Sequence, residues 1–489
     1  MQRWYPWKVN QMHKTIWKPQ PRQAIFQSRA EDEVLYGGAA GGGKSDAILT
    51  EALRQVGKKN YRALILRKTY PQLSELIDRS REIYSQAFPN AKYNDSKHVW
   101  RFPSGAMIYF GAMQHTKDRI NYQGKRYDFI AFDELTHFTW EEYSYLMSRN
   151  RPSGPGTRVY MRATTNPGGI GHGWVKDRFI DAAPPGTTIW EEREVITPEG
   201  KSLKKKMSRA FISASVFDNQ ALLNNDPDYI FRLDAMPEKE RRALLYGDWD
   251  SFSGQVFTEW KNVPDNYDER VGTHVISPFA IPSGWKIWRG LDWGFTRPFS
   301  VGWYAVDYDG RLYRIREYYG TTGTPNVGLE MNADEVARNI REIEKNDPNL
   351  KGRKIIGIAD PAITQRQNGE SIADIMQREG VIWDKADNTR IPGKMQVHYR
   401  MAFDSSNRPK LYVFSTCKHF IRTIPNLVYS ESNVEDVDTD GEDHIYDELR
   451  YVCMANPTTP PESKKKAIKE FNPLEEEEIK PYSFGIKYL

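Results

Sequence analysis

The sequence predicts an α/β protein with two domains, and three observations lead to this class. The chain has 489 residues, which is long for a single hydrophobic core. A glycine-rich segment near the N-terminus lies between an apolar strand and an amphipathic helix. Farther along, apolar strands are predicted at 63–66, 107–110, 129–132 and 159–161, with helical segments between some of them. This alternation is typical of a mostly parallel sheet that binds its ligand at the strand ends.

The composition is that of a globular chain, with 39% hydrophobic residues, 27% charged residues and a net charge of +4. No apolar run approaches the roughly 20 residues of a membrane helix, and the N-terminus lacks a secretory signal, so we expect a protein inside a cell, without a membrane partner. Cys417 and Cys453 lack a metal-like spacing, which predicts buried free thiols. Because the net charge is low, any contact with DNA would come from local basic runs, although such runs are more often solvated surface. These runs are 201–209, 239–242 and 464–466.

The segment 35–53, LYGGAAGGGKSDAILTEAL, has the context of a phosphate-binding loop, because a strand precedes it and a helix follows. Such a loop, here with Gly41 and Gly42 at its centre, points its amides at phosphate oxygens near the positive end of the helix dipole. We expect Lys44 to reach the β- and γ-phosphates and Ser45 to hold Mg²⁺. A flexible glycine linker would explain neither flanking element. The residues that match G-x-x-x-x-G-K-[ST] are Gly38, Gly43, Lys44 and Ser45.

Three further features of the first half indicate ATP hydrolysis. The strand 127–132 ends in Asp133, suited to the magnesium shell, and Glu134, suited to polarise the attacking water, although such a pair alone could cap a helix. Gln23 resembles the glutamine that reads the adenine edge in several ATP-driven motors. The Thr-Thr-Asn that ends in Asn166 is suited to sensing the γ-phosphate, although Asn-Pro also opens turns.

The second half places acids at the ends of two predicted strands. Strand 286–291 ends at Asp292, and two strands joined by an Asp-Gly hairpin signal follow it. After a predicted helix, strand 355–359 ends at Asp360. Each acid has an alternative interpretation as a turn residue, so the prediction depends on the whole set.

A predicted helix over 443–454 supplies the remaining acids. Asp443 and Asp447 are four residues apart and therefore lie on one helix face, although Asp443 could instead be the helix N-cap. Carboxylates from two strand ends and one helix could bind two divalent cations, which can activate a water and stabilise the leaving oxygen of a phosphodiester. Oxygen ligands without a Cys/His set favour Mg²⁺ or Mn²⁺.

In this order, the motifs resemble the large terminase subunit of tailed bacteriophages, and the resemblance covers nearly the whole chain. The stretches that carry it are LILRKTYPQL (64–73), FDE (132–134), ATTNP (163–167), YGDW (246–249), ADPA (359–362) and DHIYDELRY (443–451). The resemblance implies a P-loop ASCE/RecA-like ATPase domain followed by an RNase H-like, resolvase-type nuclease domain. The implied divisions are an N-terminal segment 1–19, ATPase 20–250, linker 251–285, nuclease 286–456 and a tail 457–489 that binds the portal.

The resemblance also implies a genome-packaging motor that uses ATP and Mg²⁺, with Mn²⁺ as an alternative at the nuclease site. Its subunits would form a ring, with five as the expected number, on the portal of a procapsid. They would pump double-stranded DNA inward and cut concatemers, with a small terminase subunit as a further partner. We expect such a protein in the host cytoplasm, transiently on the procapsid, and not in the mature virion.

The resemblance also implies roles for single residues. It places Lys44 in the Walker A loop and makes Asp133 and Glu134 the Walker B pair. The residues that match the nuclease acids are Asp292, Asp360 and Asp447, with Asp443 as an addition or substitute. Two departures concern arginine: the loop 39–42 has none, and Gln123-Gly124 stands where many relatives have Arg-Gly. A cation on the transferring phosphate is worth several orders of magnitude in rate. We therefore expect an arginine from a neighbouring subunit, and the candidates, ranked with the first ahead, are Arg119, Arg126, Arg149 and Arg151.

Two other classes of protein remain open. A helicase-like or DNA-remodelling ATPase would keep the first half and bind DNA through the second without cutting it. A nucleotide-gated assembly scaffold would bind ATP without turning it over.

Overall fold

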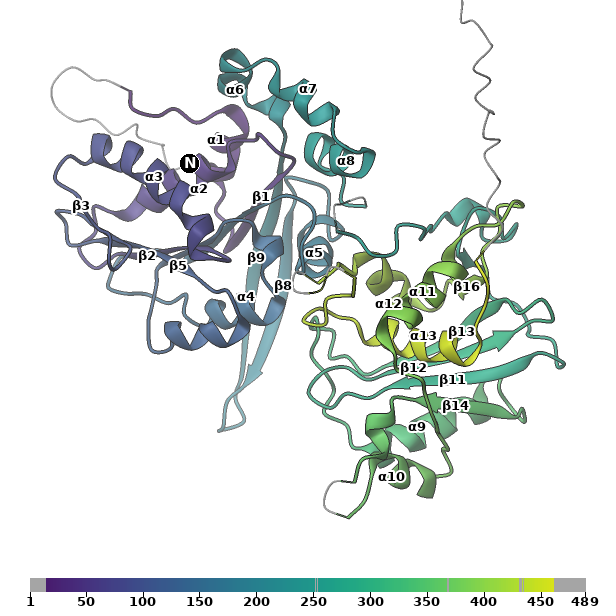
Figure 1. The fold of residues 1–489 in the computed structure, drawn as a ribbon. Helices are drawn as coiled ribbons and strands as arrows, with labels where there is room; N and C mark the ends of the chain where they lie inside the picture. Colours follow the sequence, from purple (N-terminus) through teal and green to yellow (C-terminus); the bar gives the residue numbers. More distant parts are fainter. Residues whose placement is uncertain are drawn as a thin grey trace, which may run out of the picture.

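The computed structural model describes residues 15–250, 252, 254–366, 369–430, 433 and 435–460. Two separate β-sheets form two lobes, which the segment after α8 (Glu238–Tyr246) joins (Figure 1). The predicted tail from residue 461 onward, with its lysine run, lies outside the described residues, as do residues 1–14. None of the described helices combines the length and the apolar character that a membrane-crossing segment needs.

The first sheet has the strand order β3-β4-β5-β2-β6-β7-β1-β9-β8, and the six strands from β5 to β9 run parallel. Strand β7 lies between β1, which leads into the glycine-rich loop, and β6, which ends before Asp133. One strand inserted between these two is the arrangement of ASCE-type P-loop ATPases. The strands are β1 (Glu33–Gly38), β2 (Arg62–Arg67), β3 (Lys92–Asn94), β4 (Val99–Arg101), β5 (Met107–Ala112), β6 (Phe129–Phe132), β7 (Tyr160–Thr165), β8 (Thr188–Ile196) and β9 (Ser202–Ala214).

Helices cover both faces of this sheet. Because side chains alternate along a strand, Ala63 and Ile65 of β2 pack with α2 and α3, whereas Leu64 and Leu66 pack with α4 and α5 on the other face. Burial on both faces explains why the strands read as continuous apolar runs. The helices are α1 (Pro21–Ser28), α2 (Lys44–Ala52), α3 (Tyr70–Ala87), α4 (Trp140–Met147), α5 (His172–Val175), α6 (Gln220–Asn225), α7 (Tyr229–Asp234) and α8; short helical turns are η2 (Thr116–Tyr122), η3 (Leu135–His137) and η4 (Lys176–Ile180).

The second sheet has the strand order β10-β16-β13-β12-β11-β14-β15. Five adjacent strands of this sheet, β13-β12-β11-β14-β15, have the RNase H-like arrangement. In it, β12 is antiparallel to both neighbours and β14 is parallel to β11. The strands are β10 (Val275–Ile276), β11 (Lys286–Asp292), β12 (Ser300–Val306), β13 (Leu312–Tyr319), β14 (Ile355–Ala359), β15 (Asp384–Lys385) and β16 (Leu411–Phe414).

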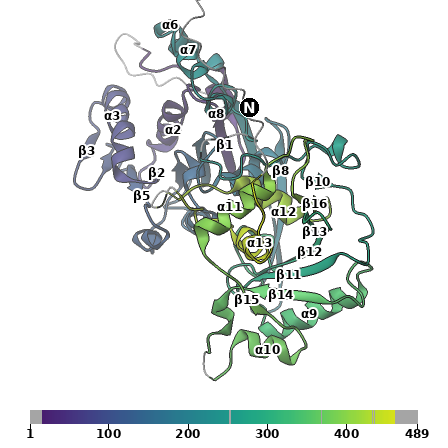
Figure 2. The ribbon, with the colours of Figure 1, turned by 45° about the vertical axis from the view of Figure 1, so that its right-hand side comes forward.

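Helices also lie on both faces of the second sheet. Helices α9 and α10 lie below it in Figure 1, and α11, α12 and α13 lie above it, as Figure 2 also shows. Cys417 and Cys453 are buried free thiols, which confirms the prediction. The helices are α9 (Ala333–Asn346), α10 (Ile372–Arg378), α11 (Arg390–Met401), α12 (Lys418–Thr423) and α13 (His444–Ala455).

Helix α13 approaches the sheet closely at one pair of glycines. Gly290 on β11 and Gly302 on β12 are directly opposite each other, and a Cβ on either would lie 2.5 Å from Glu448 Oε1. Glu448 is fully buried and pairs at 2.5 Å with Arg314, which is also fully buried. This contact fixes the helix that carries Asp443 and Asp447 over the centre of the sheet.

Candidate functional site

The glycine-rich loop lies at the carboxyl end of β1 and leads directly into α2. Gly38 ends β1 with a φ of 114°, a conformation that favours glycine. The carbonyl oxygen of Gly41 accepts a hydrogen bond from Asn219 Nδ2 at 2.7 Å, and that of Gly42 accepts one from the Tyr36 hydroxyl at 2.8 Å. These contacts hold the loop in place before the first turn of the helix.

Gln23 in α1 lies against the end of this loop. Its Nε2 donates to the carbonyl oxygen of Gly43 at 2.7 Å, and its Oε1 accepts from the backbone amide of Gln20 at 2.7 Å. Gly43 has a φ of 70°, and a Cβ there would lie 2.5 Å from Gln23 Nε2. The buried amide of Gln23 thus supports the loop, and its contact with a base stays a prediction.

Lys44 points back into the loop. Its Nζ donates to the carbonyl oxygen of Ala39 and to Asn166 Oδ1, both at 2.7 Å. Burial lowers the pKa of Lys44, and the charge of Glu134 opposes that shift. Ser45 is half-buried in the first turn of α2 beside it. The geometry therefore places the predicted Walker A lysine next to the predicted Thr-Thr-Asn.

Asp133 is 1% exposed and is held from two sides. Its Oδ1 accepts a hydrogen bond from the Thr164 hydroxyl. Its Oδ2 lies 2.6 Å from both Nε and Nη2 of Arg67. The carboxylate predicted to bind magnesium is thus already paired with a cation of the same chain.

Glu134 follows with a strained backbone. Its φ of 57° and ψ of 62° lie in the left-handed region, which a residue with a side chain rarely adopts. The backbone amide of Asn166 donates to Glu134 Oε2 at 3.2 Å, and Asn166 Nδ2 lies 3.5 Å from Oε1. Strain of this kind is found at functional positions. Lys44, Asn166 and Glu134 therefore form one connected chain of polar side chains.

Arg119 lies apart from this site. It is in η2, where it forms an ion pair with Glu141 of α4 and lies 5.7 Å from the ring centroid of Tyr145. Its contacts are with surface residues of its own chain, and its role toward a neighbouring subunit stays a prediction.

Sequence reasoning missed Arg67. A signal was available, because Arg67 directly follows the apolar strand residues 63–66 and the carboxyl ends of parallel strands meet at one edge of a sheet. The predicted arginines lie near Asp133 along the chain, whereas Arg67 lies on β2, the strand next to β6 in the sheet.

In the second domain, the structure brings the predicted acids toward one edge of the sheet. Asp292 ends β11, and its Oδ2 lies 3.2 Å from His444 Nδ1. Asp360 follows β14, where its Oδ1 accepts from the amide of Ala362 at 2.6 Å and its Oδ2 accepts from the Tyr451 hydroxyl at 2.8 Å. Both partners of the side chains, His444 and Tyr451, come from α13.

Asp443 and Asp447 begin α13 and differ in their contacts. Asp443 occupies the N-cap position, but its side chain makes no capping hydrogen bond. Asp447 Oδ1 lies 3.0 Å from Arg450 Nη2, and its Oδ2 lies 3.4 Å from Arg390 Nη1. The N-cap alternative therefore does not account for the buried carboxylate of Asp443.

Burial and mutual repulsion raise the pKa values of these acids. Burial raises the pKa of Asp292 to about 6; hydrogen bonding to His444 opposes the shift, and the charges of Asp447 and Asp360 add to it. Burial also raises the pKa of Asp443 well above its ordinary range, and the charge of Asp447 adds to that shift. Burial alone would lower the pKa of His444, but Asp292 raises it above the ordinary value. The carboxylates of this cluster therefore repel one another.

Among the described residues, no group of three His, Cys, Asp or Glu side chains is arranged so that it could hold a metal ion. The chemistry of the donor set nevertheless fits a divalent cation, because Asp292 and Asp443 are buried carboxylates whose repulsion a cation would remove. Asp447 is already paired with two arginines. A cation bound here would therefore require side chains such as His444 and Arg390 to give up contacts with the acids.

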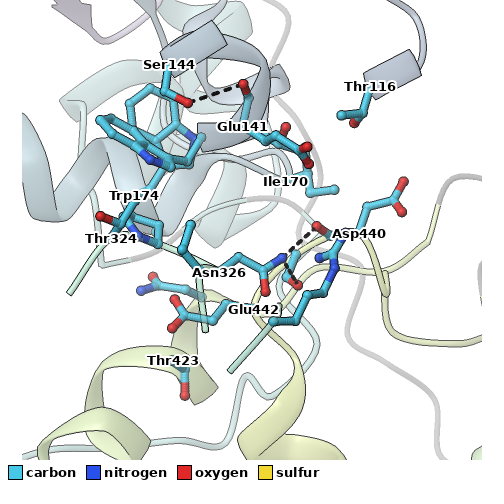
Figure 3. A pocket seen from close by; sticks show the side chains of 18 of the residues that line it. Thr116, Glu141, Ser144, Ile170, Trp174, Thr324, Asn326, Thr423, Asp440 and Glu442 are labelled. Carbon is cyan, nitrogen blue, oxygen red and sulfur yellow. Dashed lines mark hydrogen bonds between the residues drawn. The ribbon is translucent and has the colours of Figure 1, made fainter. Parts of the chain in front are cut away.

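A cavity of about 760 Å³ separates the two domains near these acids. Glu141 and Trp174 line it from the first domain, and Asn326 and Glu442 line it from the second domain (Figure 3). Asn326 Oδ1 lies 2.9 Å from His444 Nε2, so the cavity wall is connected to Asp292 through the imidazole. The sequence analysis singled out neither Asn326 nor His444 as a site residue.

The fold and the two sites define a P-loop ATPase joined to an RNase H-like domain. Residues 35–261 match the sequence model of a family described as terminase large subunit, T4likevirus-type, N-terminal. Over this segment, which is just under half of the chain, the protein matches the large terminase family. No curated protein matches it.

Solved structures of large terminases are similar to this chain at low identity. A large terminase from a thermophilic bacteriophage is 16% identical with a TM-score of 0.37, and the match covers 89% of this chain and 98% of that one. The large terminase of bacteriophage HK97 is 11% identical with a TM-score of 0.46, and coverage is 92% and 96%. The P22 large terminase nuclease domain is 17% identical with a TM-score of 0.31, and coverage is 42% and 92%.

Proposed function

We propose that this protein is the ATP-driven, DNA-cutting subunit of a viral packaging motor. The observation that carries the proposal is the chain of contacts from Lys44 through Asn166 to Glu134, beside the buried Asp133, in a segment that matches the large terminase family. The separate acidic cluster in the RNase H-like domain supports the cutting activity.

In the ATPase domain, each residue has a role that follows from its position. The backbone of the glycine loop and the Nζ of Lys44 bind phosphate oxygens, with Lys44 exchanging its contact with Asn166 for the substrate. Glu134 orients the attacking water and accepts its proton, and Asn166 holds that carboxylate. Ser45 and Asp133 would hold Mg²⁺, which would supply charge neutralisation on the phosphates. Asn166 touches both functional groups and is therefore suited to report whether the terminal phosphate is present.

In the nuclease domain, Asp292, Asp360 and Asp443 are the residues that would hold divalent cations, with Asp447 as a further ligand after release from Arg390. Mg²⁺ or Mn²⁺ held by these residues would supply the activation of a water and the stabilisation of the leaving oxygen of a DNA phosphodiester. Tyr451 orients Asp360 through its hydroxyl.

The partners follow from the family. We propose double-stranded DNA as the substrate of translocation and cutting, the portal and a small terminase subunit as protein partners, and a homo-oligomeric ring, with five subunits expected, on the procapsid. The motor would work in the host cytoplasm and leave before the virion matures. Helicase-like remodelling without cutting is the second candidate, because the described acids are not arranged around a metal ion.

Two measurements test the proposal. ATP hydrolysis should rise strongly when procapsids that carry a portal are added, and unchanged hydrolysis would favour a remodelling ATPase. Plasmid DNA with Mn²⁺ should be nicked by the wild type and not by Asp292→Ala. Asp307→Ala is the matched control, since Asp307 lies at the hairpin turn between β12 and β13, away from the cluster. Equal nicking by Asp292→Ala and the wild type would remove the nuclease assignment.

A further inference from the structure

The phosphate loop lacks a positive side chain between Ala39 and Gly42, yet the site contains a second cation besides Lys44. Arg67 is the last residue of β2, and the register pairs Leu66 with Phe132 on β6. Arg67 therefore lies beside Asp133, at the carboxyl edge of the sheet where the loop also lies.

The contact between Arg67 and Asp133 is close and sheltered. Nε and Nη2 of Arg67 both lie 2.6 Å from Asp133 Oδ2, and the Arg67 side chain is 17% exposed. A guanidinium has five N–H donors in a planar fork, and Asp133 Oδ2 engages two of its nitrogens. The fork matches the geometry of phosphate as well as that of carboxylate.

The charges of Arg67 and Lys44 act on the same small volume. Burial opposes the charge of Arg67, but Asp133 and then Glu134 raise its pKa above the ordinary value. Arg67 in turn contributes to the lowered pKa of Lys44. The interior edge of the site thus contains two cations and two carboxylates, and both cations are within electrostatic reach of Glu134.

We propose that Arg67 is the intramolecular cation that binds the terminal phosphate of the nucleotide. Resting on the proposed ATPase function, this inference makes Asp133 the holder of Arg67 while no divalent cation is bound to that carboxylate. A divalent cation on Asp133 would repel the guanidinium, which lies 2.6 Å from that carboxylate, and would free its fork to bind oxygens of the terminal phosphate. An arginine of the same subunit would supply the positive charge that the loop 39–42 lacks, whether or not a neighbouring subunit contributes a further arginine.

The test compares two nucleotides on three forms of the full chain. Arg67→Gln removes the charge and keeps a polar side chain. Arg62→Gln at the other end of β2 is the matched control, since within the described part of the chain its guanidinium donates to the backbone carbonyls of Tyr61 and Gly105. Calorimetric titration with Mg²⁺ present measures the affinity for ADP and for ATPγS. We expect Arg67→Gln to weaken ATPγS binding about 10- to 100-fold and ADP binding less than about 3-fold, whereas Arg62→Gln changes neither.

Equal loss of affinity for ADP and ATPγS, or no loss for either, would overturn the proposal and leave Arg67 as a clamp for Asp133. If Arg67→Gln does not fold, Arg67→Lys decides the question, because it keeps the charge but loses the fork and should still weaken ATPγS more than ADP. A wild type that binds neither nucleotide would overturn the proposed function itself. If the wild type binds both nucleotides and the Arg67 variant loses affinity for ADP and ATPγS equally, the role of Arg67 is overturned and the proposed function is not.

Discussion

Removing the Glu448 carboxylate should destabilise the RNase H-like domain more than the loss of an exposed ion pair would. Both Glu448 and Arg314 are 0% exposed, and the pair is joined at 2.5 Å with the Ser300 hydroxyl 3.1 Å from the same oxygen. Glu448→Ala leaves the Arg314 guanidinium buried without its closest counter-charge, with Glu317 at 3.8 Å as the remaining carboxylate. Breaking a buried pair in this way costs about 3–5 kcal/mol, whereas losing an exposed pair costs at most about 1 kcal/mol.

Differential scanning calorimetry of the full chain measures this effect as a shift in the midpoint temperature at which the RNase H-like domain unfolds. For a domain of this size, about 3–5 kcal/mol corresponds to a fall of about 6–20 °C. Asp309→Ala is the matched control, because Asp309 pairs with Arg311 on the surface with its side chain 74% exposed, and it should shift the transition by no more than about 4 °C.

A double variant separates the lost pair from lost packing. Replacing both partners with apolar residues of similar size, Arg314→Met with Glu448→Leu, should restore much of the stability, since the fully buried pair is removed as a unit and Glu317 loses only a contact at 3.8 Å. The reasoning is refuted if Glu448→Ala melts within about 2 °C of the wild type, or if the double variant is no more stable than the single one.

Three further outcomes are expected. Glu134→Gln should bind ATP as the wild type does but hydrolyse it at least about 100-fold more slowly in a steady-state phosphate assay, because the group that accepts the proton is gone; unchanged turnover would contradict its assignment. With divalent cations chelated, the raised pKa of Asp292 contributes stability below about pH 4 that is lost as the pH rises through about 6, by at most about 1.4 kcal/mol per unit. Denaturant titrations should therefore show the stability of the wild type relative to Asp292→Asn falling across that range, and a constant difference would argue against the shift. Mixing Arg119→Ala with Lys44→Ala subunits should restore some ATPase activity if Arg119 acts on a neighbour, and no recovery would remove it as the candidate.

Local sequence patterns predicted several elements of the fold. The predicted strand 355–359 coincides with β14, and the helix predicted over 443–454 is α13, displaced by one residue at each end. Hydrophobic periodicity succeeds here because these elements bury one face or both faces, and the burial sets which residues are apolar.

The contacts within the sites could not be obtained in the same way. Arg67 pairs with Asp133 because β2 and β6 are neighbours in the sheet. The two residues are 66 positions apart along the chain. That His444 touches Asp292 depends on how closely α13 docks, which the opposed glycines at 290 and 302 decide. Neither distance is encoded in local spacing.

The sequence by itself determined the phosphate loop, the Asp-Glu after a buried strand and the acids at two strand ends, because each is a short-range pattern tied to a single element. The tertiary structure decided which charges meet: the arginine on Asp133, the histidine on Asp292 and the two arginines on Asp447. The physical reason is that electrostatic interactions fall off with distance through the folded interior, and those distances are fixed by strand order and helix docking rather than by position along the chain.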